Sequence, residues 1–142
     1  MKKLLTAAAI SLAAFSVQAD EQKQLVTILT DAEPQTQLMA MVLTMQAAKQ
    51  GAAAHVLLCD SAGDLALKDA PESATQGQPP KGMSPQGLMK KIIGMPNAKV
   101  EVCAIYLPAT GAEKDVLLDG IGVAKPGEMA ASVLAADASM SF

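Results

Sequence analysis

One predicted strand in the sequence ends at a residue with a reactive side chain, Cys103. Residues 99–103, Lys-Val-Glu-Val-Cys, alternate as expected of a β-strand, and Gly111 closes the following turn eight residues after Cys103. The thiol of Cys103 therefore lies at the carboxyl end of a predicted strand. A helical turn just after it would direct backbone N–H groups at the sulfur, which favours the thiolate, a nucleophile and sulfur acceptor. The alternative is a small buried hydrophobic residue, because unpaired cysteines are often buried.

His55 is the only histidine, and it lies inside the apolar run 53–59, Ala-Ala-His-Val-Leu-Leu-Cys. A single histidine in an apolar strand is more often a hydrogen-bonded core group than a metal ligand or a general base. The sequence offers no convincing Ser-His-Asp arrangement around it. We therefore expect His55 to have a structural role.

Four acidic residues follow predicted strands and are expected at the same sheet edge as the thiols: Asp31, Glu33, Asp60 and Asp64. Carboxylates at this edge are typical of a cation site or an acid–base pair. The alternative, which we favour, is that they form turns, cap helices and maintain solubility. Such an acidic edge also opposes ionisation of a nearby thiol.

Residues 1–19 are typical of a secretory signal peptide. Lys2 and Lys3 precede the apolar run 4–15, and Val-Gln-Ala at 17–19 matches a cleavage site. The apolar run is too short for a stable membrane anchor, so we expect no membrane attachment after cleavage. We accordingly predict a periplasmic protein in which 20–142 form one domain, in a compartment that oxidises paired thiols.

Charge and composition exclude several classes of partner. Residues 20–142 hold nine basic residues against fourteen acidic ones, a net charge of −5, which argues against nucleic acid and anionic membranes. Tyr106 and Phe142 are the only aromatic residues after position 19, too few for stacking on bases. Neither a Walker loop nor a strand-anchored Gly-x-Gly-x-x-Gly is present, so we expect no nucleotide cofactor.

Three evenly spaced methionines suggest a different function for an exported protein. Met83, Met89 and Met95 recur every six residues and offer soft thioether ligands for copper. We expect Met89 instead to face the core from a short amphipathic helix. We therefore assign no metal ligand.

Predicted strands alternate with predicted helices along the chain, which is the order that builds a parallel sheet with crossover helices. The predicted strands are 24–30, 53–59, 99–103, 121–124 and 139–142. The predicted helices are 34–50, 85–93, 115–120 and 126–136, with a long loop at 68–82. In the first helix, Leu38, Met41, Met45 and Ala48 share one face and are expected in the core.

The segment after Cys103 resembles a known family. Seven residues separate Cys103 from Gly111, and residues 116–126 read Val-Leu-Leu-Asp-Gly-Ile-Gly-Val-Ala-Lys-Pro. This pattern of strand, cysteine, seven residues, glycine and a leucine-glycine-valine segment resembles the DsrE-like sulfur-relay family, over most of 20–142. The resemblance implies a three-layer α/β/α fold with a five-stranded, mainly parallel sheet, and oligomeric assembly. It further implies that Cys103 carries sulfur as a persulfide.

Cys59 departs from the family pattern. The strand order that the resemblance implies places the strands ending at Cys59 and Cys103 side by side, about 4.8 Å apart, within the Cα range that a disulfide tolerates. An intervening strand would double that spacing to nearly 10 Å and prevent the bond. Export is a second departure, because the best-understood relatives act in the cytoplasm within hetero-oligomers.

Three interpretations of the cysteines remain open: a sulfur-handling or redox thiol, a structural disulfide, or two inert thiols. We favour an exported protein that binds or relays sulfane sulfur as a persulfide on Cys103, with Cys59 as its redox partner. It would be a homo-oligomeric carrier or accessory protein, served by a sulfur donor or acceptor protein, rather than a self-sufficient enzyme. The alternative is a noncatalytic oligomeric interaction module in which Cys59 and Cys103 form a structural pair.

Overall fold

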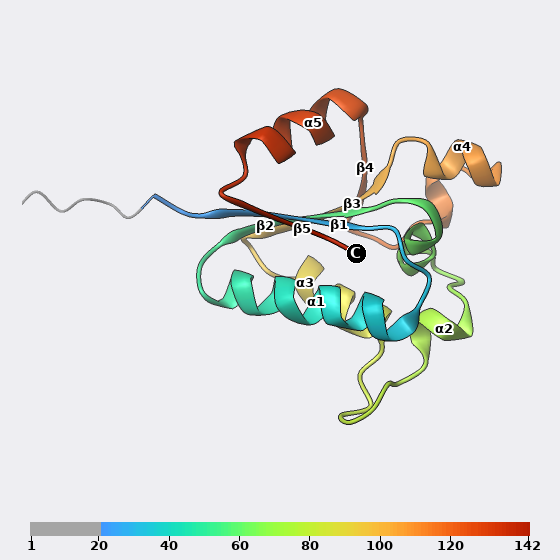
Figure 1. Ribbon diagram of the computed structural model, residues 1–142. Coiled ribbons are helices and arrows are strands. Elements are labelled where there is room, and N and C mark those ends of the chain that lie inside the picture. The colour runs from blue at the N-terminus through green and yellow to red at the C-terminus, as the bar shows by residue number, and fades with distance from the viewer. Residues whose placement is uncertain (1–20) are drawn as a thin grey trace, which may run out of the picture.

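Five short extended runs form one sheet in the computed structural model, which describes residues 21–142 (Figure 1). The strands are β1 Gln24–Leu29, β2 Ala53–Leu58, β3 Ala98–Cys103, β4 Ile121–Ala124 and β5 Ala138–Ser141. They lie in the order β4-β3-β2-β1-β5, and every neighbouring pair is parallel. The predicted three-layer α/β/α fold is confirmed, with a sheet that is wholly rather than mainly parallel. The central position of β2 explains its nearly continuous apolar sequence, since both of its faces are covered.

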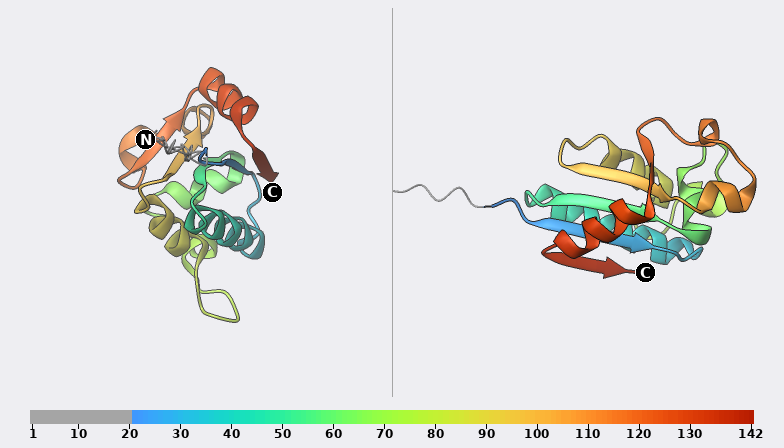
Figure 2. Two further views of the ribbon diagram at one scale, coloured as in Figure 1. Left: turned by 90° about the vertical axis from the view of Figure 1, so that its left-hand side faces the viewer. Right: turned by 90° about the horizontal axis from the view of Figure 1, so that it is seen from above.

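Helices lie on both faces of this sheet (Figures 1 and 2). The α-helices are α1 Pro34–Lys49, α2 Glu72–Thr75, α3 Pro85–Ile93, α4 Tyr106–Thr110 and α5 Pro126–Ala135, and the 3-10 helices are η1 Asp60–Ala66 and η2 Lys114–Val116. Helices α1 and α3 cover one face, α5 lies on the other, and α4 lies beyond the carboxyl ends of the strands (Figure 1). The carboxyl ends are therefore bordered by the segments that follow β2 and β3.

The larger core lies between the sheet and helices α1 and α3. Met41, Met45 and Ala48 of α1 are buried there and Leu38 packs against the cluster, as their helical spacing predicts. Met89 of α3 is fully buried, which confirms that it faces the core, and Met83 and Met95 pack against the same cluster. All three methionines thus contribute their side chains to packing.

The face under α5 has a smaller core. Its buried residues are Val26, Leu57, Cys103 and Ala124. Met129 and Ala136 pack against them from the chain that forms and follows α5, and no residue of α5 is itself fully buried. This helix is therefore attached to the sheet by modest apolar contact.

Several helix ends form as their residue types predict. Gly51, just after α1, has a φ of +95°, a conformation that favours glycine. Ser84 caps α3 by accepting a 3.1 Å hydrogen bond from the backbone N–H of Gly87, and Pro85 takes the first helical position. These signals place the start of α3 at the predicted residue.

Two segments differ from their predictions. The predicted helix 115–120 is wrong: only the 3-10 turn Lys114–Val116 forms, and the chain is extended from Leu117. Pairing with the segment after η1 prevents the helix, because Leu117 bridges Leu67 and the N–H of Leu118 donates to the Ala66 carbonyl. The predicted long loop 68–82 contains α2, held by the buried Ala74.

The predicted signal peptide, residues 1–19, lies outside the described residues. Within 21–142, no helix combines the length and apolar character needed to cross a membrane.

Candidate functional site

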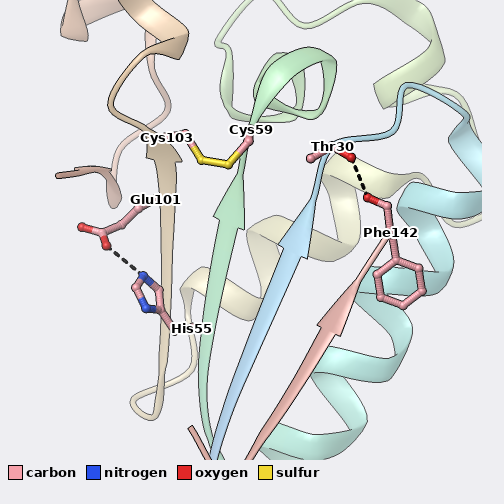
Figure 3. Close-up of a disulfide and its surroundings, with 6 residues drawn as sticks. All are labelled: Thr30, His55, Cys59, Glu101, Cys103 and Phe142. Atoms are coloured by element: carbon pink, nitrogen blue, oxygen red, sulfur yellow. Dashed lines mark hydrogen bonds and ion pairs between the residues drawn. A yellow bond between two sulfur atoms is a disulfide. The ribbon is translucent and has the colours of Figure 1, made fainter. Parts of the chain in front are cut away.

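The two cysteines meet at the carboxyl edge of the sheet (Figure 3). Strands β2 and β3 pair in parallel with Leu58 opposite Val102, so Cys59 and Cys103 follow at equivalent positions. Their Cα atoms are 5.0 Å apart, and their sulfur atoms form a disulfide. This pairing excludes the interpretation of two inert thiols. It leaves a redox pair or a structural disulfide.

The two sulfur-bearing residues differ in exposure. Cys103 is only 3% exposed and packs against Val26, Leu57 and Ala124, whereas Cys59 is half-buried. A sulfur carrier at position 103 needs its sulfur open to solvent, and in the disulfide form the burial of Cys103 agrees instead with the alternative of a small buried residue. Of the pair, Cys59 offers more surface to an incoming thiol.

The turn after Cys103 forms much as predicted. Helix α4 begins at Tyr106, and Gly111 ends it with a φ of +69°, where glycine is favoured. Ile105, at the start of this turn, is 73% exposed, which is high for a large aliphatic side chain. The edge beside the disulfide thus presents an apolar residue to solvent.

The turn after Cys59 is tighter. Asp60 has a φ of +50°, an uncommon conformation for a residue with a side chain, and it leads the chain directly into η1. Aspartate tolerates this conformation better than most residues because its carboxylate is short. The role of Asp60 is therefore turn formation, the role that we favoured for the acidic residues.

The segments that follow the two cysteines are locked together by Tyr106 and Asp64. The Tyr106 hydroxyl donates a 2.7 Å hydrogen bond to Oδ1 of Asp64, and its ring packs over Gly63, where even a Cβ atom would clash. Burial, reinforced by the Asp64 carboxylate, raises the pKa of Tyr106 well above its ordinary value. Both residues line a pocket of about 460 Å³ beside this edge.

The remaining acidic residues do not converge. Asp31 accepts a 2.7 Å hydrogen bond from the backbone N–H of Glu33, as in an Asx turn, which agrees with the favoured structural role. Over residues 21–142, no group of three histidine, cysteine, aspartate or glutamate side chains is placed to hold a metal ion.

His55 has two side-chain partners that sequence reasoning missed. Its Nε2 lies 2.8 Å from Oε2 of Glu101, and its Nδ1 lies 2.6 Å from the hydroxyl of Ser132 (the Glu101 contact is drawn in Figure 3). The predicted hydrogen-bonded histidine is confirmed, but the view that no serine and carboxylate gather around it is wrong. The one signal in the sequence was Glu101 itself, an acidic residue on the same face of its strand as Cys103.

Comparison with known proteins identifies the fold. No protein-family model and no curated protein matches the chain. The solved structure of the YchN protein from E. coli matches with a TM-score of 0.67 and 18% identity, over 85% of this chain and 99% of that one. The protein of unknown function MTH1491 from Methanobacterium thermoautotrophicum matches with a TM-score of 0.60 and 17% identity, over 86% of this chain and 100% of that one. The chain has a DsrEFH-like fold. At these identities the likeness concerns the fold alone.

Proposed function

We propose that this protein handles sulfane sulfur by cycling between the Cys59–Cys103 disulfide and a dithiol, with Cys103 as the sulfur carrier. The observation that carries the proposal is the position of the disulfide. It joins two adjacent parallel strands at their carboxyl ends, the edge at which open α/β sheets bind and transform ligands. A DsrEFH-like fold is consistent with a sulfur-relay protein.

Reduction of the disulfide is the first step, and the exposure of the two cysteines sets its direction. A thiolate of a dithiol reductant attacks Sγ of Cys59, the half-buried partner; the S–S bond breaks and its electron pair leaves on Cys103. The second thiol of the reductant then attacks the mixed disulfide. Cys59 is released as a thiol, and the reductant leaves as its own disulfide.

Loading follows on the released thiolate. Cys103 attacks the outer sulfur of a donor persulfide R–S–SH, forming Cys103–S–SH and releasing R–S⁻. An acceptor thiolate can then remove the outer sulfur and return Cys103 to the thiolate. Alternatively the Cys59 thiolate attacks Sγ of Cys103, which releases HS⁻ and forms the disulfide again. The disulfide is in this scheme the oxidised, unloaded state, and the dithiol supplies the two electrons that convert sulfane sulfur to sulfide.

A structural disulfide is the second candidate, and the burial of Cys103 favours it. With a sequence separation of 44, the cross-link is expected to stabilise the fold by about 4 kcal/mol in the chain-entropy model. A buried, apolar setting is also typical of a disulfide that resists reduction. In this case the protein would be a noncatalytic interaction module.

Mass analysis of two single variants separates the candidates. Reduced Cys59→Ser is expected to retain one extra sulfur atom on Cys103 after incubation with glutathione persulfide, because it lacks the resolving thiol. Reduced Cys103→Ser is the matched control, since it lacks the same disulfide, and it is expected to retain less sulfur than Cys59→Ser. Equal loading of the two variants would contradict Cys103 as the specific carrier, and negligible loading of both would contradict the sulfur-carrier proposal and leave the structural role.

The cellular setting is part of the same proposal. A periplasmic location is supported by the signal-like sequence of 1–19, and a homo-oligomeric state is supported by the family resemblance alone. Fractionation of cells and light scattering of the purified protein test the two points. A cytoplasmic monomer would contradict both.

A further inference from the structure

A hydrogen-bonded chain of three side chains lies on the α5 face of the sheet, away from the disulfide. His55 stands in its middle, with Glu101 on one ring nitrogen and the Ser132 hydroxyl on the other, at 2.8 and 2.6 Å. The Glu101 side chain is 7% exposed and that of His55 is 15% exposed. A serine, a histidine and a buried carboxylate are thus linked in the order used to activate a nucleophile.

The hydrogen bonds fit a neutral imidazole that donates to the acid and accepts from the serine. An ionised Glu101 can only accept, so Nε2 of His55 carries the hydrogen and donates it to the carboxylate. In the neutral tautomer Nδ1 is the acceptor, and the Ser132 hydroxyl donates to it. Lys99 places its ammonium 2.9 Å from the same Oε2 of Glu101, which compensates the buried negative charge. In this tautomer Nδ1 can receive the hydroxyl proton.

Neighbouring strands of the sheet hold the base and the acid, and helix α5 supplies the serine. His55 comes from the central strand β2, and Glu101 comes from the adjacent β3, paired in register with Leu57. Gly122 on β4 leaves room for the carboxylate, because a Cβ atom there would lie only 2.6 Å from Oε1 of Glu101. The acid and the base are therefore built on neighbouring strands rather than on loops.

The three hydrogen-bonded side chains lie beside a cleft of about 630 Å³, which is large enough for a small molecule. His55, Ser132 and Lys99 all line this cleft. Its other walls come from the amino-terminal parts of β1, β2 and β3, for example Gln24, so it lies at the opposite end of the strands from the disulfide. A ligand in this cleft has direct access to the serine and to an exposed ammonium group.

We propose that Ser132 is an activated nucleophile toward small carboxylic esters, with His55 as its general base and Glu101 as the positioning residue. Ser132 Oγ attacks the ester carbonyl carbon while its proton passes to Nδ1 of His55. The C–O bond to the alcohol then breaks, and the leaving alkoxide takes that proton. Water attacks the acyl-serine in the same manner, which releases the carboxylic acid and restores the hydroxyl. This activity is separate from the proposed sulfur chemistry.

A fluorophosphonate probe tests the proposal directly, because it reacts with activated serines. Ser132 Oγ bonds to phosphorus, fluoride leaves with its electron pair, and the proton goes to His55. We expect peptide mapping to place the label on Ser132, and Ser132→Ala to abolish it. Ser139→Ala, which removes an exposed serine of β5, is the matched control and should label as the wild type does.

The role of the base is tested by rate. We expect His55→Ala to slow labelling by about a hundredfold or more, the usual contribution of a general base. Should His55→Ala not fold, Glu101→Gln serves in its place, since it removes the carboxylate and keeps most of the side-chain shape. Thermal melts of each variant identify those that fold.

The outcomes are distinct from those of the sulfur experiments. Labelling should be unchanged in Cys59→Ser, since that variant leaves the cleft intact, so failure of one proposal does not imply failure of the other. Absence of label on Ser132 in the folded wild type, or undiminished labelling in a folded His55→Ala variant, would overturn the proposal. The three side chains would then serve only to tether α5 to the sheet.

Discussion

The hydroxyl of Tyr106 donates a 2.7 Å hydrogen bond to the carboxylate of Asp64, and this bond connects the segment after Cys103 to the segment after Cys59. Both strands that carry a cysteine are thus followed by a turn that is fixed to its neighbour. The disulfide does not hold this edge of the sheet alone. The Tyr106 interaction is therefore a second determinant of how readily the edge opens when the disulfide is reduced.

Removal of the Tyr106 hydroxyl should weaken this edge without changing its packing. We expect Tyr106→Phe to lower the free energy of unfolding by about 1–2 kcal/mol, because the half-buried Asp64 loses its partner. Urea unfolding of the oxidised variant and wild type measures the difference. Thiol reductants should also open the disulfide faster in the variant. Equal stability and equal reduction rates would show that the bond does not contribute.

Alkaline conditions should destabilise the fold through the same residue. Burial raises the pKa of Tyr106 in the folded protein, so above about pH 10 only the unfolded chain gains free energy by releasing the phenolic proton. The stability is complete below that pH and is lost as the pH rises further. Since Tyr106 is the only tyrosine, phenolate absorbance reports on it alone. Reversible ionisation near pH 10 in a protein that stays folded would contradict the prediction.

Replacement by serine should lower the free energy of unfolding by different amounts at the two cysteine positions. Both variants lose the disulfide, worth about 4 kcal/mol, but Cys103→Ser also places a hydroxyl in the cluster of Val26, Leu57 and Ala124. We expect Cys103→Ser to be less stable than Cys59→Ser by about 1–3 kcal/mol, the cost of an unpaired buried hydroxyl. Denaturant unfolding of both variants, with reduced wild type as the reference, measures the difference. Equal stabilities would indicate that Cys103 is not buried.

The room that Gly122 leaves for Glu101 should be needed for stability. Gly122→Ala places a methyl group 2.6 Å from Oε1 of Glu101, and we expect a loss of about 1–3 kcal/mol as the carboxylate shifts. Gly127→Ala is the matched control, because no atom lies within 4 Å of the added carbon and the residue lies in helix α5. The control should be neutral or slightly stabilising. Similar melting temperatures for the two variants would contradict the placement of Glu101.

Local signals in the sequence account for most of the fold. Alternation and apolar runs predict all five strands, and Ser84 with Pro85 predicts the start of α3. The helix predicted at 115–120 fails because pairing with Leu67 and its neighbours extends the chain, a contact between distant segments that no local pattern records. Tertiary pairing there outweighs local helix propensity.

The sequence likewise predicts part of the candidate site and not the rest. The Cys59–Cys103 pair follows from the strand order that the family resemblance implies, and the structure confirms that order. The burial of Cys103 could not be decided from the sequence, because it depends on packing under α5. The partners of His55 were missed because Glu101 and Ser132 are 46 and 77 residues away in the chain. Register and helix placement, rather than spacing, bring them together.

The central claim is that the Cys59–Cys103 dithiol reduces sulfane sulfur as it closes to the disulfide. The most direct measurement is to reduce the wild-type protein, remove the reductant, add glutathione persulfide and follow sulfide release together with disulfide formation by mass analysis. The account predicts that each dithiol releases one sulfide as the Cys59–Cys103 disulfide returns, and that Cys59→Ser loads sulfur without this release. Disulfide formation by air alone, with no sulfide released on adding the persulfide, would contradict it.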